Sequence, residues 1–192
     1  MLPEVFPVTG DPEADQLLAS DPLALIIGML LDQQVPMEWA FKGPHRLRER
    51  LGGLDAAKIA DMDPAELEAA FKEKPALHRF PSVMARRVQA LCRHLVECHN
   101  GEAAQVWTGV TTGAQLLARV EALPGYGPEK ARIFVALLAK RLGVRPPGWQ
   151  DAAGPFADAT PRSVADIDSA EALQRVREWK RAQKAQGKRK TD

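Results

Sequence analysis

Apolar positions recur at helical spacing along most of the chain, and proline and glycine separate the periodic stretches. The segment 83–95 places its apolar residues on one face of a helix that ends near Asn100-Gly101. The segment 133–138 marks a second apolar helix face, in a helix that ends at Gly143. No stretch alternates apolar and polar residues for long enough to indicate a strand. The pattern predicts an all-α protein of about nine or ten helices, many of them short.

Helix starts are signalled by an oxygen-bearing residue followed directly by proline. The oxygen caps free amides, and proline suits the first helical position. The pairs are Asp11-Pro12, Asp21-Pro22, Asp63-Pro64 and Thr160-Pro161. Two capping-box patterns add to this: Asp63 with Glu66 supports the start at Asp63, and Thr112 with Gln115 indicates another start. We therefore expect helices to begin at each of these positions.

Composition is ordinary for a globular chain of 192 residues, with 45% hydrophobic and 27% charged residues. This excludes a wholly disordered chain, a collagen-like chain and a membrane protein. The apolar run from Pro22 to Leu31 is too short to cross a bilayer. No basic segment precedes an apolar run at the start, so we expect no signal peptide and a cytoplasmic, nucleoid-associated protein. We expect one domain over residues 1–183 and a basic disordered tail over 184–192.

Charge is distributed unevenly, although the net charge is only +1. Residues 1–75 carry a net −7, residues 76–150 a net +6 and residues 151–192 a net +2. The stretch 175–190 holds eight Lys or Arg residues against the single acid Glu178. This asymmetry indicates an anionic partner for the middle and end of the chain. A solvated helix face followed by a loose basic tail would give the same composition.

The two cysteines, Cys92 and Cys98, fit a reducing compartment and are too few to supply the four thiolates of an iron–sulfur cluster. His94 and Cys98 are four residues apart, whereas Cys92 and His99 lie on a different helix face. The four side chains therefore do not converge on one ion. We expect neither a metal nor a cofactor.

The stretch 123–131 carries the most specific chemistry. A helix ends near Leu123, two glycines permit a tight turn, and a new helix begins at Pro128. Amides at the positive end of that helix form a seat for a phosphate group. Lys130 and Arg132 add positive charge beside it. These features meet the sequence-independent requirements of nucleic-acid binding.

The Leu-Pro-Gly-x-Gly sequence at this turn resembles the helix-hairpin-helix of the HhH-GPD DNA glycosylase superfamily. A second similarity is a Leu-x-Gln-Gln step, Leu31 to Gln34, at the end of an early helix about ninety residues before the turn. The resemblance covers roughly residues 20–155. It implies an all-α, two-lobed helical fold without an iron–sulfur cluster, with its hairpin at 114–142. It also implies that the partner is double-stranded DNA containing a damaged or mismatched base, bound by a monomer.

The same resemblance suggests which residues contact DNA. Gln34 matches the residue that fills the gap left by a flipped base; alternatively, it is a polar residue that ends a helix before Pro36. Trp39 and Trp149 are candidates to line a base pocket, although core packing is the favoured role for Trp39. The residues expected at the DNA interface are Gln34, Leu123, Gly125, Tyr126, Gly127 and Lys130.

Base removal needs a carboxylate, because departure of the base leaves positive charge on the sugar. In the family this Asp follows the second hairpin helix, which points to Asp151. Its spacing of 22 residues from Glu129 is slightly long, and the usual Val-Asp-x-His context is missing. Asp158 is the other carboxylate in this loop. Alternatively, Asp151 only caps a short helix at Ala152.

Members that also cleave the sugar–phosphate backbone place a nucleophilic lysine two residues after the second hairpin glycine. Here that position is Glu129, and Lys130 follows one residue later, a rotation of about 100° on a helix. We therefore expect a monofunctional DNA glycosylase that uses water. A non-catalytic DNA-binding protein of the same fold is the first alternative, and a helical interaction module without a nucleic-acid role is the second.

Two further segments have expected roles. The stretch 78–82, which begins at His78 and precedes two arginines, is a possible phosphate contact or wedge, but surface solvation is favoured. Val106 and Trp107 precede the hairpin and are expected in the core.

Overall fold

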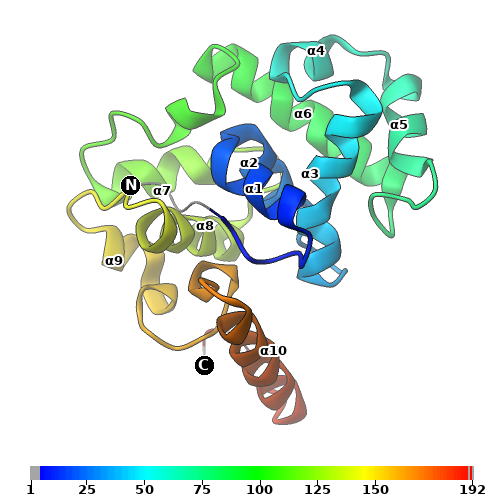
Figure 1. Cartoon of the computed structure of the whole chain (residues 1–192). Helices are drawn as coiled ribbons and strands as arrows, with labels where there is room; N and C mark the ends of the chain where they lie inside the picture. The colour runs from blue at the N-terminus through cyan, green and yellow to red at the C-terminus, as the bar shows by residue number, and fades with distance from the viewer. Residues whose placement is uncertain (1–4, 190, 192) are drawn as a thin grey trace.

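The structure is a computed structural model that describes residues 5–189 and 191. Figure 1 shows that the described chain is built from helices, as the hydrophobic pattern predicts. The described residues contain ten α-helices and three 3₁₀-helices. The α-helices are α1 (Pro12–Ser20), α2 (Pro22–Leu31), α3 (Met37–Leu51), α4 (Ala56–Asp61), α5 (Pro64–Lys72), α6 (Pro81–His99), α7 (Gly113–Glu121), α8 (Pro128–Arg141), α9 (Trp149–Ala153) and α10 (Ala170–Ala185). The 3₁₀-helices are η1 (Ala103–Val106), η2 (Gly154–Ala157) and η3 (Val164–Asp166).

The helices form two lobes with α2 between them (Figure 1). In one lobe α4 and α5 pack on α6, and α3 packs against α2. In the other lobe α7, α8 and α9 pack on one another, and η2 and η3 cover α8. Every residue of α2 from Leu23 to Leu31 is buried. The end of α2 is therefore held in a fixed place between the lobes.

Three of the four predicted Asp-Pro and Thr-Pro helix starts are confirmed. The carboxylates of Asp11, Asp21 and Asp63 each accept hydrogen bonds from amides in the first turn of the helix that follows. The predicted start at Pro161 is wrong. The chain turns there instead, and the next helix, η3, is capped by Ser163.

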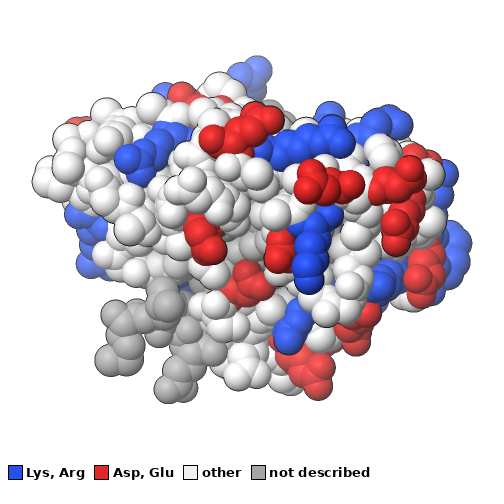
Figure 2. Space-filling view, turned by 90° about the horizontal axis from the view of Figure 1, so that it is seen from above, with Lys and Arg blue, Asp and Glu red and all other residues white. Residues whose placement is uncertain are grey.

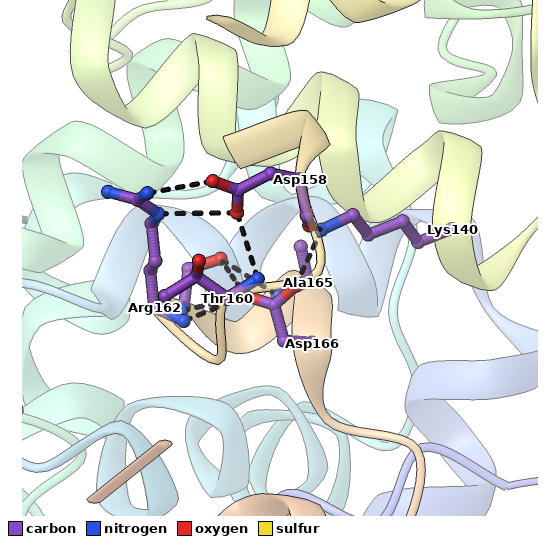
Figure 3. A network of polar contacts seen from close by, with 7 residues as sticks. Lys140, Asp158, Thr160, Arg162, Ala165 and Asp166 are labelled. Carbon is purple, nitrogen blue, oxygen red and sulfur yellow. Dashed lines mark hydrogen bonds and ion pairs between the residues drawn. The ribbon is translucent and has the colours of Figure 1, made fainter. Parts of the chain in front are cut away.

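Figure 3 shows the contacts that explain why no helix begins at Pro161. The Asp158 carboxylate accepts from the Thr160 amide at 2.9 Å and pairs with the Arg162 guanidinium at 2.8 Å. The Asp166 carboxylate accepts from the amides of Arg162 and Ser163 at 3.1 and 3.0 Å. These side-chain acceptors take the amides that helical carbonyls would otherwise bind. The Lys140 ammonium then ties the turn to α8 through the Asp158 carbonyl and the Asp166 carboxylate, both at 2.6 Å.

The last helix, α10, projects away from the two lobes (Figure 1). Only Ala172, Leu173 and Val176, in its first half, are buried. The helix continues to Ala185, so the boundary expected at 183 falls inside it. Residues 190 and 192 of the predicted tail lie outside the described residues.

None of the described helices is individually long and apolar enough to span a bilayer. The pair α1 and α2 meets the length and hydropathy criteria only when taken together across a bend of 114°.

Candidate nucleic-acid interface and catalytic site

The loop over residues 32–36 joins α2 to α3 and carries Gln34. The Gln34 side chain is exposed, and its backbone φ is 58°, in the left-handed region that non-glycine residues rarely adopt. The surrounding structure must hold the loop in this conformation, because an unsupported chain would relax from it.

His78 supports the loop from the segment before α6. Its Nε2 atom lies 3.1 Å from the Leu31 carbonyl oxygen and 3.0 Å from that of Gln33. Carbonyl oxygens only accept, so Nε2 carries the proton, and Nδ1 accepts from the Phe80 amide at 3.0 Å. Burial is the main cause that lowers the pKa of His78 below its usual value. The ring is therefore a neutral brace fixed in one tautomer.

The surface solvation favoured for this segment is wrong for His78, which is only 1% exposed. Arg79 and Phe80, by contrast, are exposed. No local sequence signal links His78 to a loop 45 residues earlier, so the sequence missed this support.

Lys130 supports the loop from the hairpin. Its ammonium donates to the carbonyl oxygens of Met29, at 2.5 Å, and Asp32, at 2.9 Å. A cation at a helix C-terminus satisfies end carbonyls and complements the helix dipole. The Tyr126 hydroxyl also donates to α2, to the Ile26 carbonyl at 2.7 Å. The hairpin and the Gln34 loop are consequently joined into one unit.

Gln33 completes the support of the loop. Its amide nitrogen donates to the Leu30 carbonyl at 2.7 Å, and its amide oxygen accepts from Arg87 on α6 at 2.5 Å. Carbonyls and side chains at the end of α2 thus have partners in α6, in the segment before α6 and in α8.

Three hairpin side chains for which the sequence predicts DNA contacts are directed into the protein. Leu123 and Tyr126 are buried, and Lys130 turns toward α2. All three side chains are thus engaged within the fold, and their DNA contacts stay a prediction.

The two hairpin glycines are needed for different reasons. Gly125 has φ 85°, and a Cβ atom there would lie 2.3 Å from the Leu30 Cδ1 atom. The conformation of the hairpin turn and its packing on Leu30 therefore require glycine at position 125. Gly127 is the N-cap residue of α8, with φ −75° and no side-chain cap, and a Cβ there would meet nothing within 4 Å. Open space at an uncapped helix start is what an incoming phosphate needs.

Asp151 lies on α9 and is exposed. The residue at the helix cap is Gly148, so the alternative that Asp151 only caps a helix at Ala152 is wrong. No hydrogen bond or ion pair involves its carboxylate among the described residues.

The placement of α9 is set by the start of α7. The Gly113 amide donates to the Pro147 carbonyl at 2.8 Å, and a Cβ on Gly113 would lie 2.4 Å from the Gly148 oxygen. At its other end, Gly154 lies against the Arg132 side chain. No described contact brings Asp151 to the hairpin turn or to Gln34.

Asp158, the other candidate carboxylate, is occupied by the turn of Figure 3. The hydrogen bond from Arg162 is the main cause that lowers its pKa. Its oxygens are committed to holding the turn.

The candidate pocket tryptophans lie in different places. Trp39 is half-buried, donates from Nε1 to the Ala76 carbonyl at 3.2 Å and lines an open groove of about 570 Å³ beside Lys42 and Arg46. It therefore does not occupy the core position that the sequence favoured. Trp149 is half-buried against the core. The expected core position of Trp107 is confirmed, with its ring centroid 5.9 Å from that of Phe134.

The cysteines of α6 differ in environment. Cys92 is buried, and burial raises the pKa of its thiol to about 12, whereas Cys98 is exposed. Within the described part of the chain no group of three or more His, Cys, Asp or Glu side chains could hold a metal ion.

The face over α4 and α6 is not distinguished by an excess of positive charge. Figure 2 shows this face from above, with Lys and Arg side chains interspersed among Asp and Glu. A uniformly basic DNA surface is therefore not found on this side.

Comparison with known proteins agrees with the sequence motifs. A family model, the HhH-GPD superfamily of base excision DNA repair proteins, matches residues 27–191. No curated relative matches the chain. A solved structure of a trapped covalent intermediate of endonuclease III with DNA, an estranged-adenine complex, is similar at 23% identity and a TM-score of 0.43. That similarity covers 64% of this chain and 57% of the endonuclease III chain. On the match to the family model, the chain belongs to the HhH-GPD superfamily of base excision DNA repair proteins.

Proposed function

We propose that this protein is a monofunctional DNA glycosylase of base-excision repair. It would flip a damaged or mismatched base out of double-stranded DNA and hydrolyse the bond between that base and its sugar. We further propose that it acts as a cytoplasmic monomer. The observation that carries the proposal is the direct attachment of the hairpin to the Gln34 loop through Lys130, together with its attachment to α2 through Tyr126. The proposed phosphate seat is the start of α8 at Gly127, and the proposed plug is Gln34, which would fill the gap left by the flipped base. These contacts hold the two in fixed positions relative to each other.

The hairpin would bind the DNA backbone. The open space around Gly127 and the uncapped start of α8 support a phosphate contact there. Such a contact positions the duplex without reading its sequence. Gln34 would enter the duplex beside it, because its side chain is exposed on a loop supported from several sides. Its amide can bind the orphaned base while its stem fills the gap.

Asp151 is the proposed catalytic carboxylate. As the base leaves, positive charge develops on the sugar, and a nearby anion stabilises it. The attacking water adds its oxygen to the sugar carbon and gives a proton to the Asp151 carboxylate, while the base departs with the bonding electron pair and takes up a proton from solvent. The Asp151 carboxylate has no described partner to neutralise it, whereas Asp158 is held by Arg162 and Thr160.

The contacts of Lys130 support hydrolysis by water rather than attack by an amine. A nucleophilic lysine must present an unprotonated nitrogen to the sugar. The Lys130 nitrogen instead donates to two carbonyl oxygens at the end of α2. Glu129 occupies the position where bifunctional relatives carry lysine, and a carboxylate forms no Schiff base.

A second candidate is a non-catalytic DNA-binding protein of the same fold. The observation in its favour is that no described contact brings the Asp151 side chain to the hairpin turn or to Gln34, although α9 itself packs on α7 and α8. The two candidates share the DNA interface and differ only in chemistry.

The deciding experiment is incubation with duplexes that carry uracil, a thymine mismatch, alkylated bases or oxidised bases, followed by alkali and strand analysis. We expect one class of lesion to give a strand break that depends on alkali. Asp151→Asn should bind the same duplex equally well and lose excision by on the order of 10²-fold or more. The matched control, Asp158→Asn, should keep excision. Binding without excision of any lesion would instead favour the non-catalytic candidate.

A further inference from the structure

A groove of about 390 Å³ runs between the Gln34 loop and α10. One wall is the loop itself with the start of α3, residues 32–38. The other wall is formed by three basic side chains of α10, those of Arg177, Lys180 and Arg181. The proposed plug and the basic C-terminal helix therefore border the same space.

Two contacts fix α10 against this groove. The Arg177 guanidinium forms an ion pair with the Glu38 carboxylate, with its Nε atom 2.5 Å from Oε1. The Lys180 ammonium lies 3.7 Å from the Met37 sulfur. Met37 and Glu38 begin α3, directly after the loop. These contacts therefore hold α10 next to the loop that carries Gln34.

Basic residues continue along the same face of α10. Arg177, Arg181 and Lys184 are spaced by four and three residues, so they form one stripe over about two helical turns. Arg181 and Lys184 are exposed. From Arg175 to Arg189 the chain carries seven basic residues and one acid, Glu178. Burial does not explain this stripe, because the buried residues of α10 lie in its first half.

We propose that α10 is a second DNA-binding element, in which Arg181 and Lys184 bind backbone phosphates next to the base pair that Gln34 enters. This inference rests on the proposed function, because it requires the Gln34 loop to face DNA. Charge complementarity identifies the occupant: a polyanion that already lies along the loop would meet the basic wall of the groove on α10. The opposite wall carries two acids, Asp32 and Glu38, of which Glu38 is paired with Arg177. Cations in the last turns would also complement the helix dipole, and the experiment separates this explanation from DNA binding.

The test uses the full chain and a duplex with one central abasic-site analogue, so that it does not depend on knowing the excised base. Affinity is measured against salt concentration for the wild type and for the double variant Arg181→Gln, Lys184→Gln. Each phosphate contact contributes about −0.9 to the logarithmic salt slope, so we expect the slope to shrink by roughly 2. At moderate salt the affinity should fall on the order of 10-fold.

The matched control is Arg48→Gln, Lys58→Gln. Both residues are exposed cations in the last turns of their helices, Arg48 at the C-terminal end of α3 and Lys58 in α4. Figure 1 shows α4 at the other end of the molecule from α10. If the α10 cations act only on the helix dipole, the two double variants should change thermal stability and DNA affinity alike. We expect only the α10 variant to lose affinity.

Phosphate position is tested by replacing single phosphates with neutral methylphosphonates. Wild-type binding should weaken at positions within about three nucleotides of the analogue, since α10 borders the loop directly. The α10 variant should lose this sensitivity. An unchanged salt slope in the α10 variant, in a protein whose wild type binds the duplex, overturns the inference and leaves the proposed function standing. Absence of duplex binding by the wild type overturns both.

Discussion

The Nζ atom of Lys130 lies 2.9 Å from the carbonyl oxygen of Asp32, a residue 98 positions earlier in the chain. The bond joins the first turn of the second hairpin helix to the loop that carries Gln34. One side chain thus links the proposed phosphate seat to the proposed plug. It also explains why a lysine in this segment need not act as a nucleophile.

We expect Lys130→Gln to lower stability rather than to remove a chemical step. Loss of a charged donor to the carbonyls of Met29 and Asp32 should reduce the free energy of unfolding by about 2 kcal/mol, measured by denaturant titration. Borohydride should trap no covalent DNA adduct with either protein. A trapped wild-type adduct that disappears in Lys130→Gln would make Lys130 the nucleophile and contradict the monofunctional proposal.

The hairpin glycines should respond in opposite ways to alanine. Gly125→Ala places a Cβ at φ 85° and against Leu30, so we expect a loss of about 2 kcal/mol in unfolding free energy. Gly127→Ala meets no neighbour and an ordinary φ, so stability should stay equal or rise by about 0.5 kcal/mol. The added methyl of Gly127→Ala should nevertheless weaken binding to all duplex sequences alike. Unchanged affinity in this folded variant would argue against the phosphate seat.

Substitutions at Gln34 should likewise change the free energy of unfolding and the excision activity in different directions. Its φ of 58° is strained for glutamine, so Gln34→Gly should keep or raise the free energy of unfolding, by up to about 1 kcal/mol. Loss of the plug should at the same time lower excision from paired duplexes more than from single strands. Gln34→Ala, which keeps the backbone strain, is the control for the stability change. Equal losses on both substrates would leave Gln34 without a plug role.

Local signals in the sequence predicted local structure well. Asp-Pro pairs fixed three helix starts because both the cap and the proline act within a few residues. The glycine turn located the hairpin for the same reason. The helix start predicted from Thr160-Pro161 is wrong because the nearby carboxylates of Asp158 and Asp166 bind backbone amides that a helix would use.

Side-chain direction in the site could not be predicted, because it depends on contacts between distant segments. Tyr126 and Lys130 belong to the motif for which the family resemblance implied DNA contacts, yet both side chains turn toward α2 and donate to its carbonyl oxygens. His78 depends on a loop 45 residues away. The spacing of Arg181 and Lys184 on one helix face is visible in the sequence. Their position near the Gln34 loop is visible only in the folded structure.

His78 predicts a pH-dependent stability. Burial lowers the pKa of its imidazole in the folded state below the value of 6.5 that it has when unfolded. The unfolded chain therefore takes up a proton first as the pH falls, so this contribution to stability is complete above about pH 6.5 and is lost below it. His99, whose pKa burial also lowers, adds a change of the same sign. The part due to His78 is the difference between wild type and a His78 variant.

Two variants isolate that part. His78→Gln keeps an amide donor that can reach the carbonyls of Leu31 and Gln33 but cannot be protonated, so the loss of stability between about pH 6.5 and 5 should become smaller. His78→Leu removes the donor and should cost about 2 kcal/mol already at pH 7.5, because buried carbonyls lose their partner. Denaturant titrations across this pH range measure both effects. A His78→Gln protein whose stability falls as steeply as that of the wild type would show that the buried imidazole is not the titrating brace of the Gln34 loop.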